Sequence, residues 1–160
     1  MTASPSASAS GDGAAADLYR PFRPRRARVM AWSIAGGEIL VLTGLAVALP
    51  GPNVHWYDRL GFLLVAAAVA ATLSRFARLL AVPDRDGIRV RNVVYSRRLD
   101  WAQIVRVQFG GGNPWAVLDL SDGDTLAVMA VQRADGERAV AEARRLATLV
   151  ALHTRTSRDD

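Results

Sequence analysis

The sequence predicts an α+β membrane protein in which a two-helix transmembrane hairpin precedes a small antiparallel sheet with one C-terminal helix. Two apolar runs, residues 29–49 and 60–82, are separated by only ten residues. Runs of 21 and 23 residues reach about 31 and 34 Å as helices, which is enough to cross a hydrocarbon core of about 30 Å. From residue 83 onward, apolar and polar residues instead alternate with the period of strands, and a segment with helical period follows.

The composition narrows the function classes. The 160-residue chain leaves room for one small domain beside the spans. It has no cysteine, which excludes disulfides, thiol nucleophiles and cysteine-bound metals. The net charge is +5, but residues 83–160 carry twelve Arg against eleven acids. We therefore expect no basic stripe for nucleic acid in the folded part.

Residues 1–28 are predicted to form a disordered tail that ends in a basic juxtamembrane cluster. The first 17 residues are almost all small or polar, so little burial offsets the entropy of ordering them. Residues 20–28 hold five Arg directly before the first apolar run, which favours the cytoplasmic side for this end. More arginines follow the second run, so we expect a multi-pass protein of the cell membrane with both termini cytoplasmic.

The first run also contains the parts of a secretory signal, with Ala46-Val47-Ala48 as a cleavage-like site. Its apolar core exceeds the roughly 7–15 residues of a signal peptide, and a second span follows at once. We therefore expect the first run to remain as a span.

One acid lies well inside a predicted span. Glu38 is nine residues beyond the start of the first run, roughly 13 Å deep, where a carboxylate is costly and is a functional candidate. Its expected partner is Arg75, near the inner end of the second run, so that the two form an intramembrane polar pair. The alternatives are a protonated Glu38 or a pair that serves packing alone.

Residues 83–154 are predicted to form one antiparallel sheet covered by one helix. Alternating apolar residues predict strands at 88–91, 93–99, 104–109, 115–120 and 125–131. Asp122-Gly123 marks a tight hairpin turn. Apolar residues at helical spacing predict an amphipathic helix over 134–153, and residues 155–160 are a polar tail.

Three stretches carry a family resemblance: GIRVRN (87–92), SRRLDW (96–101) and PWAVLDLSDGDTLAVMAVQ (114–132). With two spans in front, they resemble a bacterial pleckstrin-homology-like (PH-like) family, the one named for low-molecular-weight protein antigen 6. The resemblance implies a cytoplasmic PH-like split barrel, capped by the C-terminal helix and tethered to the membrane, without established enzymatic activity. Two features depart from the pattern. The segment is shorter than a seven-stranded PH domain, and the Lys that begins the eukaryotic lipid-binding pattern is absent.

Four arginines lie around the first hairpin of this domain: Arg89, Arg91, Arg97 and Arg98. Guanidinium groups bind phosphate bidentately, so these residues form a candidate surface for anionic lipid or a partner. The alternative is a solvated edge that discourages strand pairing.

No motif supports catalysis. The two histidines, His55 and His153, stand in neither triad nor metal-ligand spacing, so we expect no catalytic residue, metal or cofactor. The sequence favours a non-enzymatic docking module on the lipid bilayer, for inner-leaflet anionic headgroups or for a membrane or cytoplasmic protein, with a homo-oligomer as a further candidate. The alternative is a small oligomeric transport or channel accessory subunit that uses Glu38 in the membrane.

Overall fold

The computed structural model describes residues 17–48 and 55–156, which belong to two compact units. Residues 25–79 form one unit, and the chain up to Pro24 joins the chain from Leu80 onward in the other. The predictions for the tail before residue 17, for connector residues 49–54 and for residues 157–160 lie outside the described part.

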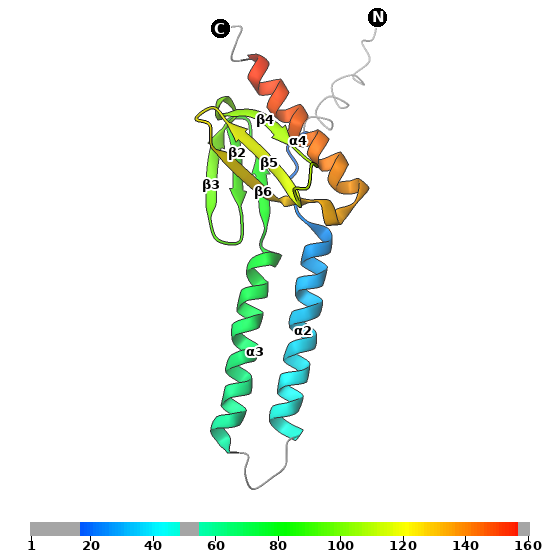
Figure 1. The fold of residues 1–160 in the computed structure, drawn as a ribbon, viewed down its shortest axis with the longest axis vertical. Coiled ribbons are helices and arrows are strands. Elements are labelled where there is room, and N and C mark those ends of the chain that lie inside the picture. The colour runs from blue at the N-terminus through cyan, green and yellow to red at the C-terminus, as the bar shows by residue number, and fades with distance from the viewer. Residues whose placement is uncertain (1–16, 49–54, 157–160) are drawn as a thin grey trace, which may run out of the picture. The chain divides into compact units, whose positions relative to one another are not determined.

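Two helices, α2 (Arg25–Ala48) and α3 (Trp56–Ala77), make up the first unit (Figure 1). Both are long and apolar enough to cross a membrane, and only 17% and 6% of their most apolar stretches are buried. A core helix of a soluble protein would bury most of its apolar side chains. The residues buried between the two helices are small: Ala31, Ala35, Ala46 and Ala66.

The helix ends differ from the predicted spans of 29–49 and 60–82. Each helix starts four residues earlier than its predicted span, and α3 ends at Ala77. The apolar residues that follow belong to strand β1 (Leu80–Pro83) of the second unit. Sequence alone did not separate them, because a membrane helix and a buried strand use the same apolar side chains.

Two three-stranded antiparallel sheets and a C-terminal helix form the rest of the second unit, which confirms the predicted fold class. The first sheet has the order β1, β2 (Gly87–Arg91), β3 (Ser96–Asp100). The second has the order β4 (Ile104–Gln108), β5 (Trp115–Leu120), β6 (Thr125–Gln132). Helix α4 (Glu137–Thr156) runs past the strands (Figure 1). The described strands do not close into a barrel.

One core joins both sheets to α4, and its fully buried members include Ile88, Leu99, Ile104, Leu118, Val128, Leu146 and Leu149. The strand predicted at 93–99 begins only at Ser96, because the preceding residues form a turn in which the Asn92 amide donates to the Tyr95 carbonyl (2.9 Å). Gly87 is required where β2 meets β3, since a Cβ there would clash with the carbonyl oxygen of Leu99.

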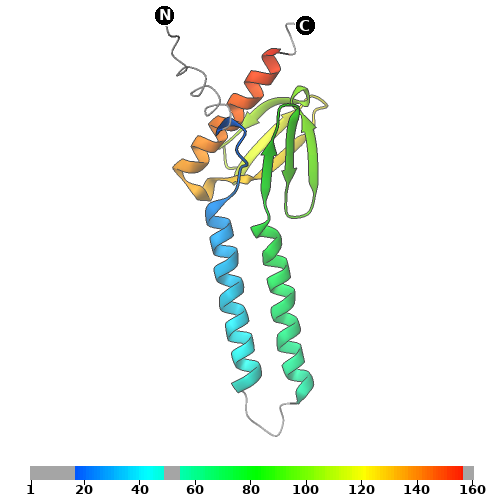
Figure 2. The same cartoon turned by 180° about the vertical axis from the view of Figure 1, so that it is seen from behind.

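The N-terminal segment, residues 17–24, was predicted as disordered tail but packs on the second unit (Figure 2). Phe22 is fully buried. Its amide donates to the Ala81 carbonyl (2.8 Å), and the Ala81 amide donates back to the Phe22 carbonyl (3.1 Å). This bridge extends the first sheet beyond β1. The buried ring and the paired backbone supply the stabilisation that the small residues further upstream lack. The helical hairpin is therefore an insertion within the folded domain.

Candidate functional site

The four predicted arginines lie on the first sheet but do not share one face. Arg89 stands opposite Arg98 in the β2–β3 register, and residues 91 and 96 are likewise opposite. Directly opposed residues point to the same side of a sheet, so Arg89, Arg91 and Arg98 share the solvent face. Arg97 is opposite the buried Val90, so its side chain leaves the backbone on the other face of the sheet. The candidate surface is thus reduced to three arginines.

Two of the four arginines have acidic partners. Nη2 of Arg98 lies 3.0 Å from Oδ2 of Asp84, and Nη2 of Arg97 lies 3.8 Å from Oδ2 of Asp122. Exposed pairs of this kind contribute only about 0–1 kcal/mol. Within residues 17–48 and 55–156, no ion pair involves Arg89 or Arg91. These two guanidinium groups keep their full capacity to bind an anion.

The polar pair of Glu38 and Arg75 stays a prediction. Glu38 continues the buried stripe of Ala31 and Ala35 on α2, and its Oε2 atom is buried without a hydrogen-bond partner among the described residues.

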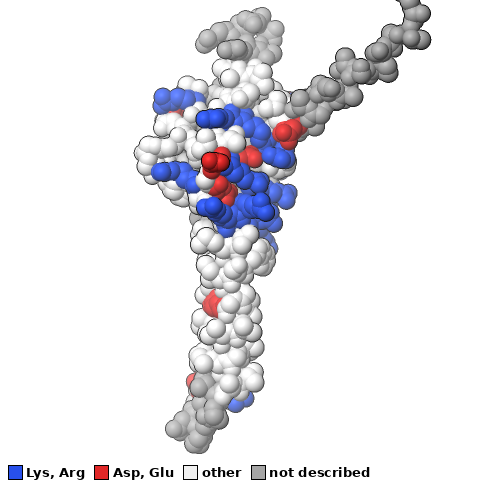
Figure 3. Space-filling model, turned by 90° about the vertical axis from the view of Figure 1, so that its right-hand side faces the viewer, with Lys and Arg blue, Asp and Glu red and all other residues white. Residues whose placement is uncertain are grey.

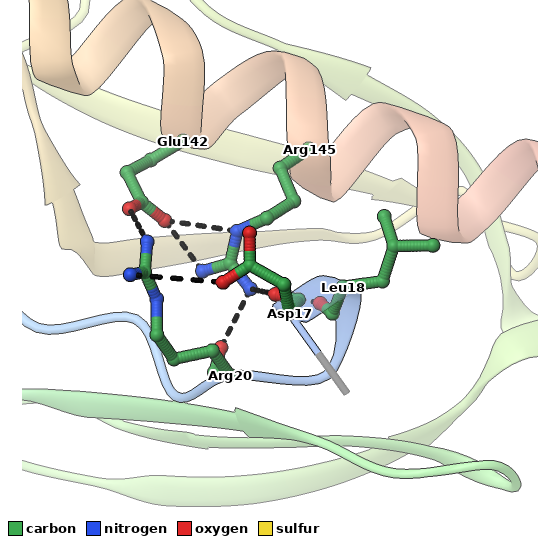
Figure 4. Close-up of polar contacts among 5 residues, drawn as sticks. All are labelled: Asp17, Leu18, Arg20, Glu142 and Arg145. Carbon is green, nitrogen blue, oxygen red and sulfur yellow. Dashed lines mark hydrogen bonds and ion pairs between the residues drawn. The ribbon is translucent and has the colours of Figure 1, made fainter. Parts of the chain in front are cut away.

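A cluster around Arg145 of α4 holds the N-terminal segment and was not predicted (Figure 4). Nη1 of Arg145 donates to the carbonyls of Asp17 (3.3 Å), Leu18 (2.8 Å) and Arg20 (2.6 Å). Its guanidinium carbon lies 3.7 Å from the ring centroid of Phe22. Glu142 accepts hydrogen bonds from Arg145 and from Arg20. The guanidinium of Arg145 therefore binds a segment of its own chain.

The sequence contains a pattern from which the packing of this segment could have been predicted. Leu18, Tyr19 and Phe22 are large apolar residues in front of the first span, where a solvated tail gains nothing from them. All three pack in or against the core.

His153 also serves the attachment of this segment. Its Nε2 lies 2.8 Å from the hydroxyl oxygen of Tyr19, and its ring stacks on Trp101 with a centroid distance of 5.0 Å and an interplanar angle of 4°. The indole Nε1 of Trp101 donates to the carbonyl of Asp84 (3.0 Å). The histidine thus joins α4, the N-terminal segment and the start of the η1 turn (Trp101–Gln103).

The second sheet carries a carboxyl group with a shifted pKa. Nε2 of Gln108 donates to Oδ2 of Asp119 (2.7 Å), and Nε of Arg106 donates to the same oxygen (3.0 Å). The hydrogen bond from Gln108 is the largest cause and lowers the pKa of Asp119. Desolvation by burial, the next largest cause, raises this pKa, and the hydrogen bond and positive charge of Arg106 lower it further. The three side chains form a polar link across β4 and β5.

Comparison with known proteins decides the family. A profile described as bacterial PH domain matches residues 81–148. Uncharacterised proteins of Mycobacterium bovis and of two Mycobacterium tuberculosis strains are 33% identical over 108 residues, which cover 68% of this chain and 67% of each relative. The chain belongs to the bacterial PH domain family. No solved structure matches it. The match begins at Ala81, so the helical hairpin and Phe22 lie outside it although Phe22 completes the PH domain.

Proposed function

We propose that this protein is a membrane-anchored, non-enzymatic docking module whose PH domain contacts the anionic headgroups of the leaflet in which it is anchored. The observation that carries the proposal is the Phe22–Ala81 bridge. It pairs a residue just before α2 with a residue just after α3, so both ends of the helical hairpin continue into the PH domain. If α2 and α3 span a bilayer, both must enter it from the side of the PH domain.

Charge favours the cytoplasmic side for this domain. Five arginines occupy residues 20–28, and Arg75 and Arg78 stand at the end of α3. Such residues next to a span are retained in the cytoplasm. The inner leaflet is the anionic one, so the proposed side and the proposed ligand agree.

Arg89 and Arg91 are the proposed headgroup-binding residues. They are exposed, lie two positions apart on the same face of β2 and have no ion pair among the described residues. Each basic residue near an anionic surface contributes about 1 kcal/mol. Together they supply an attraction of about 2 kcal/mol, which is weak and salt-sensitive.

The experiment uses a domain without spans, in which residues 17–24 are joined to 79–156 by a short Gly-Ser turn. The antiparallel Phe22–Ala81 pairing allows such a connection. Its binding to vesicles with and without anionic lipid is measured by sedimentation. Arg89→Gln with Arg91→Gln should weaken binding to anionic vesicles about 30-fold, whereas Arg138→Gln with Arg144→Gln, two exposed arginines of α4, is the charge-matched control. Equal losses in both double variants would refute a specific surface, and no binding at all would favour a protein partner.

A second candidate function rests on Glu38. Its Oε2 atom is buried without a hydrogen-bond partner among residues 17–48 and 55–156, and an unpaired intramembrane carboxyl group is typical of transport pathways. We propose as the alternative a small oligomeric accessory subunit of a transporter or channel. A homo-oligomer in mild detergent that dissociates on Glu38→Leu but not on Leu40→Ala, which changes an exposed residue, would support it. A stable monomer would contradict it.

A further inference from the structure

The turn between β2 and β3 exposes apolar side chains. Val94 is 85% exposed and Tyr95 is 46% exposed. Short hairpin turns favour Asn, Gly and Asp, whose side chains suit the turn backbone and water. The turn here instead reads Asn-Val-Val-Tyr, residues 92–95. Valine and tyrosine are therefore not residues that a short hairpin turn favours.

The turn is held rigidly by its first residue. Asn92 is only 6% exposed. Its Nδ2 donates to the carbonyl of Ala127 (2.7 Å), and its Oδ1 accepts from the amide of Met129 (3.2 Å), both on β6. The amide of Asn92 closes the turn on the carbonyl of Tyr95 (2.9 Å). The two exposed side chains therefore project from a fixed support.

Strand register relates this turn to the end of the second span. Leu80, the first residue of β1, is paired with Arg91, the last residue of β2. Leu80 follows Ala77, the last residue of α3, by three residues. Three residues reach at most about 11 Å, and adjacent strands are about 4.8 Å apart. Covalent structure thus keeps the turn near the point where the chain leaves α3. The β1–β2 turn, residues 84–86, lies at the opposite end of the same strands.

We propose that Val94 and Tyr95 insert into the interfacial layer of the leaflet that α3 leaves, as an apolar contact independent of lipid charge. Tyrosine suits this layer because its ring is apolar and its hydroxyl group can remain hydrated. Arg91, which directly precedes the turn, is long enough to reach phosphates while its stem lies along apolar surface. This inference rests on the proposed spanning of the membrane by α2 and α3. The inserted turn would orient the solvent face of the first sheet relative to the headgroups.

The absence of cysteine from the chain allows a direct test. Single cysteines are introduced in the full-length protein by Val94→Cys, by Tyr95→Cys and, as a control at the other end of the sheet, by Arg85→Cys. Each is labelled with an environment-sensitive fluorophore, and the protein is reconstituted in neutral phosphatidylcholine vesicles. Lipids that carry nitroxide groups at known depths then quench the labels.

We expect blue-shifted emission at positions 94 and 95, with shallow acyl-chain nitroxides quenching these labels several-fold more than the label at 85, also at high salt. Equal quenching at 94, 95 and 85 would overturn the proposal. A blue shift without lipid quenching would also overturn it, because it would indicate contact with a second copy of the chain.

A label on the second helix separates this inference from the anchoring on which it rests. Val65 of α3 is 53% exposed, so Val65→Cys should be quenched by deep nitroxides if α3 spans the bilayer. Quenching at 65 without quenching at 94 and 95 would refute the turn insertion alone. No quenching at 65 would refute both the anchoring and the insertion.

Discussion

The helical hairpin buries small side chains, whereas the PH domain buries large apolar ones. In α2 and α3 the buried residues are alanines, while large residues such as Leu40 and Val47 are each 75% exposed. In the PH domain Ile88, Leu118 and Leu146 are fully buried, and charged side chains gather on its surface (Figure 3). In the helices, Glu38 is the one charged residue within 29–48 and 60–74, and the other charged residues lie near the helix ends.

The proposed anchoring of α2 and α3 in a bilayer explains this difference. In water, removing large apolar side chains from solvent drives folding. In a bilayer the lipid is as apolar as leucine, so helices associate through small residues that let their backbones approach. Under the proposed anchoring, each region exposes the side chains that its own surroundings, lipid or water, solvate.

The sharpest test removes the same side chain from each region. Leu118→Ala should destabilise the PH domain by about 2–5 kcal/mol, because the lost leucine leaves a cavity in the core. Leu64→Ala on the outward surface of α3, where leucine is 61% exposed, should cost less than about 0.5 kcal/mol. Denaturant unfolding of the protein in nanodiscs, followed by tryptophan fluorescence, measures both. Equal losses would show that the exposed surface of the hairpin is covered by protein.

The contact between Arg145 and the N-terminal segment gives the next largest effect. Arg145→Gln should cost about 2 kcal/mol, because several hydrogen bonds to a charged donor are lost. Backbone amide exchange at Phe22 and Ala81 should accelerate before exchange elsewhere in the sheet. The neighbouring Arg144→Gln, at an exposed position, is the control. Unchanged exchange at the bridge in Arg145→Gln would mean that the segment is held by burial of Phe22 alone.

The converse test enlarges a buried alanine of the helical hairpin. Ala35 is 4% exposed, so Ala35→Leu should push α2 and α3 apart at a cost of about 1–3 kcal/mol. Ala67→Leu on the exposed surface of α3 should have little effect. Distances between spin labels at Ile39 and Val65 report the separation of the helices. An unchanged distance in Ala35→Leu would contradict close packing at this residue.

The smallest expected effect is the pH dependence contributed by Asp119. Its pKa in the folded protein lies below the ordinary value of 3.8, so the ionised form stabilises the fold above that pH and the stabilisation is lost as pH falls through the folded pKa. The stability difference between the wild type and Asp119→Asn should therefore be constant near neutral pH and shrink below about pH 4. Gln108→Ala should reduce this dependence, because its hydrogen bond is the largest cause. A stability difference that grows as the pH falls would contradict the lowered pKa of Asp119.

Periodicity predicted the two apolar helices, most strands of the domain and α4, because each pattern depends on residues close together in the sequence. It did not reveal β1, whose apolar residues continue the run of α3. It also grouped Arg97 with Arg89, Arg91 and Arg98, because the face on which an arginine starts depends on the register with the neighbouring strand.

By itself, the sequence determined the helical hairpin, its basic borders and an antiparallel domain with a covering helix, since composition and local spacing decide which solvent each segment accepts. Only the tertiary structure decided that Phe22 completes the sheet at Ala81 and that Arg145 holds the segment in place. These contacts join residues separated by an entire helical hairpin. They form because several unrelated segments each satisfy one another's backbone groups and apolar surfaces, which no local pattern records.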